Sequence, residues 1–296
     1  MDTPQPLLFA SATDTGNIRE QNEDRLLLPP AVPDLLNQRG YLFAVADGVG
    51  GHIGGERASQ SCVDILHEAI YGNAPVALEQ AIQQVNTAVY HVAQQEAPHE
   101  GMGTTVVAAL FAMQHVLVAH VGDSRAYLIR GQYIHQITND HTLLEEKLQA
   151  GIISHEKAAS FQGINPLTRA IGKDPSVIVD VQELELHPQD YIILCSDGLS
   201  NHISADELLA ATITYSPEQV ARYLIDLTKT RGAPDNVTMV LVKVQALPIT
   251  SQKPRTWLLQ PAKDGRATPH TVIIAVVIVV TLVAIGLFVF IRMTMG

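Results

Sequence analysis

Apolar and polar positions along the chain follow two periods, which predict where strands and helices lie. Alternating or short continuous apolar runs predict strands, and apolar positions three or four residues apart predict amphipathic helices. The predicted strands span 7–13, 42–46, 104–113, 115–121, 125–130, 133–138, 177–186, 191–195 and 236–244, and one more begins at Leu26. The predicted helices span 56–70 and 78–92, with a shorter piece at 143–150 and two helices opened by capping boxes at Ser204 and Ser216. Short links between the middle strands favour antiparallel neighbours, so the order predicts an α+β fold of packed antiparallel sheets flanked by helices.

Three segments depart from this pattern. Residues 139–172 are irregular and rich in polar residues and glycine, which predicts a surface flap. Residues 247–271 are rich in Pro, Gln, Ser, Thr and basic residues, which predicts a flexible basic tether after a folded domain at 1–246. Residues 272–291 form a run of 20 uncharged, mostly β-branched or leucine residues, long enough for one transmembrane helix.

The charges around residues 272–291 predict the orientation of that helix. Four basic residues precede it, whereas Arg292 alone follows it, and basic residues favour the cytoplasmic side. The first ten residues lack the basic region and long apolar core of a signal peptide. We therefore expect a single-pass protein of the cell membrane with its folded domain in the cytoplasm.

Charge and cysteine content narrow the class of protein further. The chain has 19 basic and 30 acidic residues, and residues 247–296 hold five of the basic residues but only one acidic residue. Residues 1–246 carry a net charge of −15, from 14 basic and 29 acidic residues, so we exclude a general nucleic-acid binder. Cys62 and Cys195 both lie in apolar surroundings, which indicates reduced core thiols and no disulfide framework.

Acidic residues stand at three junctions between a predicted strand and a Gly or Asn residue. They are Asp47, which follows the run 42–46 and precedes Gly48, then Asp197 and Asp235. Asp47-Gly48 alone is also typical of a hairpin turn. If the sheets bring the three carboxylates together, their repulsion raises their pKa values unless a cation binds among them. Oxygen ligands without His or Cys at metal spacing favour Mg²⁺ or Mn²⁺, which activate water for attack on phosphate esters.

Seven short motifs extend this picture between residues 7 and 244. They are Arg19 with Asn22-Glu23-Asp24, Asp47-Gly48-Val49-Gly50-Gly51-His52, Met102-Gly103-Thr104-Thr105, Gly122-Asp123-Ser124-Arg125, Leu167-Thr168-Arg169-Ala170, Ser196-Asp197-Gly198-Leu199 and Asp235-Asn236. In these residues, and in their order, the chain resembles the bacterial PP2C-type metal-dependent protein serine/threonine phosphatases. Each motif is weak alone, but seven in order are highly specific.

The resemblance implies a four-layer αββα sandwich with two Mn²⁺ or Mg²⁺ ions at one end and a weaker third ion. By analogy Asp47 would bridge the two ions, Asp197 and Asp235 would complete one of them, and Glu23 with the Gly48 carbonyl would hold the other. The remaining assignments are Asp24 behind the ligands, Asp123 at the third ion and Arg19 on the substrate phosphate. A guanidinium suits this last role because its planar fork pairs two phosphate oxygens, although an isolated Arg19 would more simply form a surface salt bridge.

One position departs from the eukaryotic members of the family. They carry a probable general-acid His directly after the Asp-Gly pair, where this chain has Val49. His52 lies in the same glycine loop and is a minor candidate for that acid, since a His in such a loop more often serves packing or lies at the surface. His141 matches a family motif at the base of the flap, where we expect a structural role.

The resemblance implies that the substrates are phosphorylated proteins, among them membrane-associated serine/threonine kinases and their targets. A cysteine-based phosphatase is excluded, because neither Cys62 nor Cys195 has an Arg six residues later. The glycine loop lacks the Lys and Ser/Thr of a nucleotide-binding phosphate loop. The alternative from another class is a catalytically silent, membrane-tethered module that binds phosphoproteins.

Overall fold

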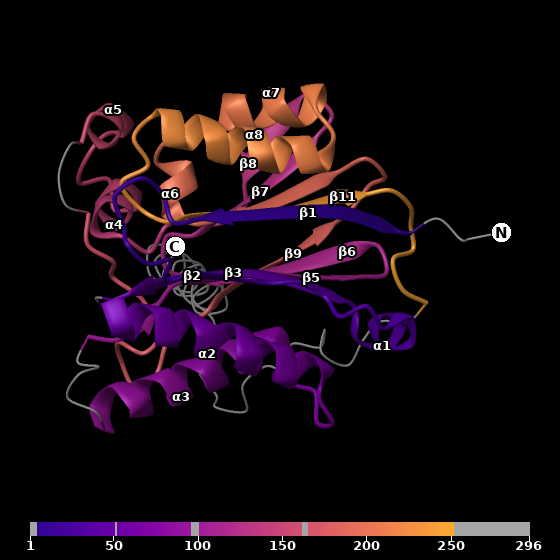
Figure 1. Cartoon of the computed structure of the whole chain (residues 1–296), viewed down its shortest axis with the longest axis horizontal. Coiled ribbons are helices and arrows are strands. Elements are labelled where there is room, and N and C mark those ends of the chain that lie inside the picture. The colour runs from indigo at the N-terminus through magenta and orange to yellow at the C-terminus, as the bar shows by residue number, and fades with distance from the viewer. Residues whose placement is uncertain (1–4, 51, 96–100, 162–164, 252–296) are drawn as a thin grey trace, which may run out of the picture. The chain divides into compact units, whose positions relative to one another are not determined.

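The computed structural model describes residues 5–50, 52–95, 101–161 and 165–251, except for the side chains of residues 52, 53 and 159 (Figure 1). The chain divides into two units, Met1–Leu259 and Gln260–Gly296. The second unit lies wholly outside the described residues. So do most of the predicted tether and the whole predicted transmembrane helix, which remain predictions.

The described part of the chain forms two antiparallel sheets. The first has the order β1-β11-β10-β7-β8. Its strands are β1 (Leu7–Asp14), β7 (Arg125–Arg130), β8 (Tyr133–Gln136), β10 (Tyr191–Cys195) and β11 (Val237–Val244). The second has the order β2-β3-β5-β6-β9, with β4 paired to the end of β3. Its strands are β2 (Asp24–Leu27), β3 (Tyr41–Val49), β4 (Gly103–Thr104), β5 (Val106–Ala112), β6 (His115–Val121) and β9 (Asp180–Glu185).

Two helix pairs cover the outer faces of the sheets (Figure 1). Helices α2 (His52–Tyr71) and α3 (Leu78–Gln95) lie against the second sheet, and α7 (Ala205–Thr214) and α8 (Pro217–Thr230) lie against the first. On α3, whose apolar positions at helical spacing predicted a buried face, Leu78, Ile82, Val85 and Val89 are buried and Val92 is half-buried. In α7, Ser204 and Glu207 form the predicted capping box. The expected α+β arrangement of packed antiparallel sheets flanked by helices is confirmed.

The core explains why the run before Asp47 is apolar at every position. Tyr41 to Ala46 are all buried, because β3 packs against α2 on one side and against the first sheet on the other. Within this layer the rings of Phe43 and Phe111 meet edge to face at 5.6 Å. Both cysteines are free and buried, and burial raises the pKa of each thiol to about 12, so they are inert core residues.

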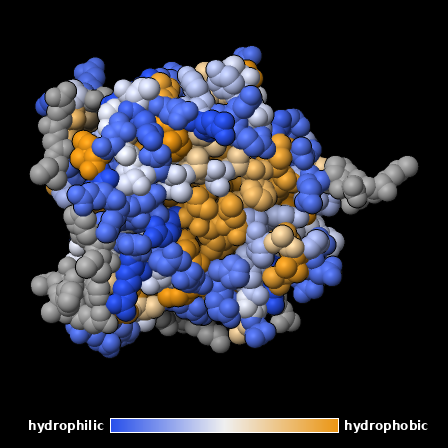
Figure 2. Space-filling view, viewed as in Figure 1, coloured by the Kyte–Doolittle hydropathy of each residue, from blue (hydrophilic) through white to orange (hydrophobic). Residues whose placement is uncertain are grey.

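The two sheets are less well covered at one edge. Figure 2 shows apolar side chains gathered at the middle of the face where β1 and β2 end their sheets. One of the side chains on β1, Phe9, is 36% exposed although its ring also packs on Phe43 at 5.1 Å. This edge shows part of the apolar interior to solvent.

Three short helices were not predicted, because one or two turns carry too few positions for a 3.6-residue period to appear. They are α1 (Pro33–Arg39), α5 (His155–Ala159) and α6 (Asp197–Ser200), whereas α4 (Leu143–Gln149) confirms the piece predicted at 143–150. The strand predicted from Val177 begins only at Asp180, where pairing with His120 of β6 starts. Asp197 is the first residue of helix α6 and does not lie in a loop.

The ordered fold continues five residues past the expected domain end at 246. Ile249 and Thr250 are buried, the Ile249 N–H donates to the Met113 carbonyl at 2.7 Å, and the Met113 N–H donates to Thr250 Oγ1 at 3.1 Å. The few apolar residues of this stretch stand among polar ones in the sequence, so the pattern did not predict that the folded domain includes them. Among the described residues, no helix is both long and apolar enough to cross a bilayer.

Candidate metal centre

Acidic side chains from five separate segments meet at one end of the sandwich. Asp24 at the start of β2 pairs in register with Asp47 near the end of β3. Asp197 begins α6 directly after β10, and Asp235 directly precedes Asn236 and β11. Charge interactions connect Asp47 with Asp24, Asp197 and Asp235, and also with Asp123 in the loop between β6 and β7. The structure therefore brings together the acids that the sequence placed at strand ends.

The pKa values of these carboxyls show how unfavourable their convergence is. Burial, followed by the charges of the other four acids, raises the pKa of Asp47 well above its usual value. Burial and the charge of Asp235 raise the pKa of Asp197, although a hydrogen bond with Asp47 opposes the shift. Burial, with Asp197 as neighbour, raises the pKa values of both Asp24 and Asp123 to about 7. Such a cluster holds its charge at neutral pH only when a cation shares it.

Two features show that the donor set fits a hard divalent ion. Oδ1 of Asp24 is buried and has no hydrogen-bond partner in the described part of the chain, while Oδ2 accepts from Ser196 Oγ at 2.8 Å. A Cβ atom added at Gly55 would lie 2.2 Å from Oε2 of Glu23, so the buried Glu23 side chain rests directly on glycine backbone. Carboxylate and carbonyl oxygens held in this way are the ligands that Mn²⁺ and Mg²⁺ take.

Arg19 reaches the same cluster from the loop after β1. Its Nη2 lies 2.8 Å from Asp235 Oδ2, and the two side chains are 44% and 39% exposed. The salt bridge that was the simpler alternative for Arg19 is therefore present, but its partner is one of the clustered acids.

Two buried polar residues of the sequence motifs, Asn236 and Thr104, hold the acids in place, a role that the sequence did not predict. The Asn236 side chain accepts from the Glu23 N–H at 2.7 Å and donates to the carbonyls of Thr15 and Gln21, both at 2.9 Å. Thr104 Oγ1 donates to the Asp47 carbonyl at 2.9 Å. The signal that could have indicated this role is their polarity inside otherwise apolar strands, because a buried amide or hydroxyl needs a specific partner.

Two residues near the glycine loop, His52 and Val49, bear on the choice of a proton donor. His52 is the first residue of α2, and its side chain lies outside the described residues, so its role stays a prediction. Val49 is the last residue of β3, which continues three residues past the predicted strand end at 46, and it has no ionisable group.

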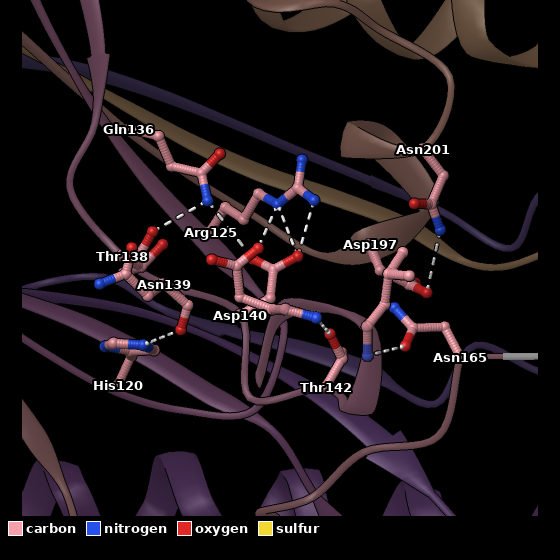
Figure 3. Close-up of polar contacts among 12 residues, drawn as sticks. His120, Arg125, Gln136, Thr138, Asn139, Asp140, Thr142, Asn165, Asp197 and Asn201 are labelled. Atoms are coloured by element: carbon pink, nitrogen blue, oxygen red, sulfur yellow. Dashed lines mark hydrogen bonds and ion pairs between the residues drawn. The ribbon is translucent and has the colours of Figure 1, made fainter. Parts of the chain in front are cut away.

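A second group of titratable side chains lies behind Asp123, at the base of the flap. Nitrogen atoms of His120 and His141 and an oxygen of Asp180 lie within 4.8 Å of one another. Figure 3 shows His120 beside Asn139, and Arg125 facing Asp140, with Asp197 nearby. Arg125 holds Asp140 through both carboxylate oxygens, at 2.9 Å from Nε to Oδ1 and 2.6 Å from Nη2 to Oδ2. The sequence predicted a structural role for His141 but did not predict its grouping with His120 and Asp180.

Known proteins share both this sequence and this fold. The family model described as protein phosphatase 2C matches residues 10–237. The serine/threonine phosphatase stp of Listeria monocytogenes is 36% identical over 242 residues, covering 78% of this chain and 93% of that protein. The serine/threonine protein phosphatase PstP of Mycobacterium tuberculosis is 34% identical over 243 residues, covering 80% of this chain and 45% of that longer protein.

Solved structures give the same result. The crystal structure of the Mycobacterium tuberculosis phosphatase PstP/Ppp matches with a TM-score of 0.72 and 33% identity, covering 81% of this chain and 99% of that one. The catalytic domain of PstP in complex with two manganese ions matches with a TM-score of 0.67 and 34% identity, covering 81% and 99%. Family, fold and clustered acids agree: the chain belongs to the protein phosphatase 2C family in its bacterial form, and it is a metal-dependent protein serine/threonine phosphatase.

Proposed function

We propose that this phosphatase works with two Mn²⁺ or Mg²⁺ ions held at the carboxylate cluster, and with a third, weaker ion at Asp123. The convergence of Asp47, Asp197 and Asp235 is the observation that carries the proposal, because these clustered acids repel one another unless cations lie among them. When bound, the ions supply an activated water for attack on phosphorus and neutralise the charge that develops there.

Each acid has a place in this arrangement. Asp47, on which four other acids of the cluster act, would hold both ions. Asp197 and Asp235 would complete the ligands of one ion, and Glu23 with the Gly48 carbonyl would hold the other. Asp24 lies behind these ligands, where its hydrogen bond from Ser196 orients it toward the cluster.

Arg19 binds the substrate phosphate. In the structure its guanidinium already lies against Asp235 and is accessible to solvent, so it can turn to two phosphate oxygens without crossing the core. Val49 cannot donate a proton, so the leaving serine or threonine oxygen takes its proton from water or from His52.

Hydrolysis of a phosphothreonine peptide tests this function directly. The purified protein should be active with Mn²⁺ or Mg²⁺, inactive in EDTA, and active again when Mn²⁺ is restored in excess. Asp47→Asn is the matched control, because it keeps the shape of the side chain and removes its charge. Full activity in the chelator, or in the Asn variant, would overturn the proposal.

We further propose that the chain is anchored to the membrane by residues 272–291, with the phosphatase domain on the cytoplasmic side. The 20 residues between Ser251 and that segment would allow a reach of about 25 Å as a flexible coil. Confinement to this layer raises the effective concentration toward phosphoproteins in the same membrane, including serine/threonine kinases and their substrates.

Two measurements test the anchor. Protease added to intact cells should leave the phosphatase domain uncut, and digestion from outside would overturn the cytoplasmic placement. Phosphosites in a deletion strain should be restored fully by the whole chain and less well by residues 1–251 at equal abundance. Equal restoration by both would mean that the anchor does not select substrates.

A further inference from the structure

We propose that His141 is a positioning residue that fixes the loop carrying Asp123 and connects this loop to both ends of the flap. The inference rests on the proposed function only in taking Asp123 as the ligand of the weaker ion. His141 is 2% exposed and lies immediately after Asp140, where the flap leaves the first sheet.

The backbone of Gly122 is held by His141 at both of its polar groups. The His141 N–H donates to the Gly122 carbonyl at 2.9 Å, and the Gly122 N–H donates to Nδ1 of the His141 ring at 3.1 Å. Gly122 has φ of 109°, and a Cβ there would lie 2.6 Å from the Thr105 side chain. The turn that presents Asp123 therefore has little freedom, and His141 supplies two of the contacts that define it.

The same residue binds the other limb of the flap. Its carbonyl accepts from the Thr168 N–H at 2.9 Å. Its Nε2 lies 3.2 Å from Oδ2 of Asp180, a close contact without the alignment of a good hydrogen bond, and Asp180 Oδ1 accepts from Arg169 Nη1 at 2.6 Å. Both limbs of the flap thus meet at His141.

A transition-metal site is the competing interpretation of this group, because two His and one Asp are a familiar donor set. The hydrogen bonds oppose it. Since Nδ1 of His141 accepts from Gly122, the ring proton lies on Nε2, the atom that would have to bind the metal. The His120 and His141 rings also stack, with centroids 4.5 Å apart and planes 25° apart, so their in-plane lone pairs run nearly parallel and do not converge.

A mechanical consequence follows from these contacts. A displacement of the flap would reach Gly122 through His141 and would change where Asp123 lies. Flap order and the demand for the weaker ion should therefore change together when His141 is replaced.

The experiment compares two substitutions of His141 in the full chain, purified in detergent. His141→Leu removes both ring contacts, whereas His141→Asn keeps an acceptor near the position of Nδ1 and loses only the contact with Asp180. Asp180→Asn is the matched control for that second contact. We measure the Mn²⁺ concentration for half-maximal activity, KM and kcat for a phosphopeptide, and, without metal, the rate of tryptic cleavage after Lys147 and Lys157, both exposed in the flap.

His141→Leu should raise the half-maximal Mn²⁺ concentration roughly tenfold, the effect of losing one buried hydrogen bond, and should speed flap cleavage by a similar factor. His141→Asn should restore most of the Mn²⁺ response. Unchanged Mn²⁺ response and unchanged cleavage in a folded Leu variant would overturn the proposal, as would one Zn²⁺ bound per wild-type chain and lost in His141→Asn.

Two further outcomes also decide the role of His141. If His141→Leu does not fold, the Asn variant decides, and equal loss of Mn²⁺ response in His141→Asn and a well-folded Asp180→Asn would overturn the role of Nδ1. If the wild-type chain needs no divalent ion at all, the proposed function fails, and flap cleavage alone then decides the role of His141.

Discussion

Removal of metal should make the stability of this protein fall as the pH rises from about 4 to 7. In the metal-free fold, burial and neighbouring carboxylates raise the pKa of Asp24 to about 7, against an ordinary value of 3.8. Between these two values the folded state binds more protons than the unfolded state. The stabilisation is therefore complete below pH 4 and is lost as the pH rises through 7.

The magnitude follows from the size of the shift. Each pKa unit corresponds to about 1.4 kcal/mol, so the shift of Asp24 alone corresponds to about 4 kcal/mol between its two limits. This is an upper value, because Asp24 shares its neighbours with the other clustered acids and a charged cluster admits water. Even half of it is a large fraction of the 5–15 kcal/mol that typically separates folded from unfolded domains.

Urea unfolding of residues 1–251 at 25 °C, followed by circular dichroism from pH 4.5 to 7.5 in EDTA, measures the effect. Asp24→Asn is the matched variant, since it keeps an acceptor for Ser196 and cannot ionise, and its pH slope should be clearly smaller. Mn²⁺ at 100 times its dissociation constant should restore about 2.7 kcal/mol at pH 7.5. Wild-type stability that is flat or rises over this range in EDTA would refute the reasoning.

Three substitutions test single contacts of the site. Asp47→Asn should lower kcat more than about 100-fold and weaken Mn²⁺ binding measured by calorimetry; a near-normal rate would make Asp47 only a turn residue. Arg19→Ala should raise KM for a phosphopeptide roughly 10-fold or more with a smaller change in kcat, and an unchanged KM would place the phosphate elsewhere. Gly55→Ala should lower Mn²⁺ affinity at unchanged secondary structure, because the new Cβ meets Glu23 Oε2 at 2.2 Å; Gly54→Ala, with its closest contact at 3.3 Å, is the control.

The sequence alone determined the features that depend on neighbours along the chain. The strand ending at Asp47 was predictable because every residue from Tyr41 to Ala46 is apolar, and the start of α7 because Ser204 and Glu207 are three residues apart. Asp47, Asp197 and Asp235 could be named for the same reason, since each stands where an apolar strand meets a glycine or asparagine, whereas Glu23, Asp24 and Asp123 were named only through the family resemblance. The order of the seven motifs then pointed to the family.

Tertiary structure alone decided how distant residues meet. Asn236 forms a hydrogen bond with Glu23 although 213 positions separate them in the sequence, and Ser196 forms one with Asp24 although 172 positions separate them. No pattern of neighbouring residues predicts such pairs. The same is true of His141, whose polarity at the base of the flap gave no sign that its ring accepts the Gly122 N–H. These contacts arise because two sheets built from interleaved strands bring their loops to one end of the sandwich. A buried polar group is satisfied by whatever the fold places beside it, and the fold is a property of the whole chain.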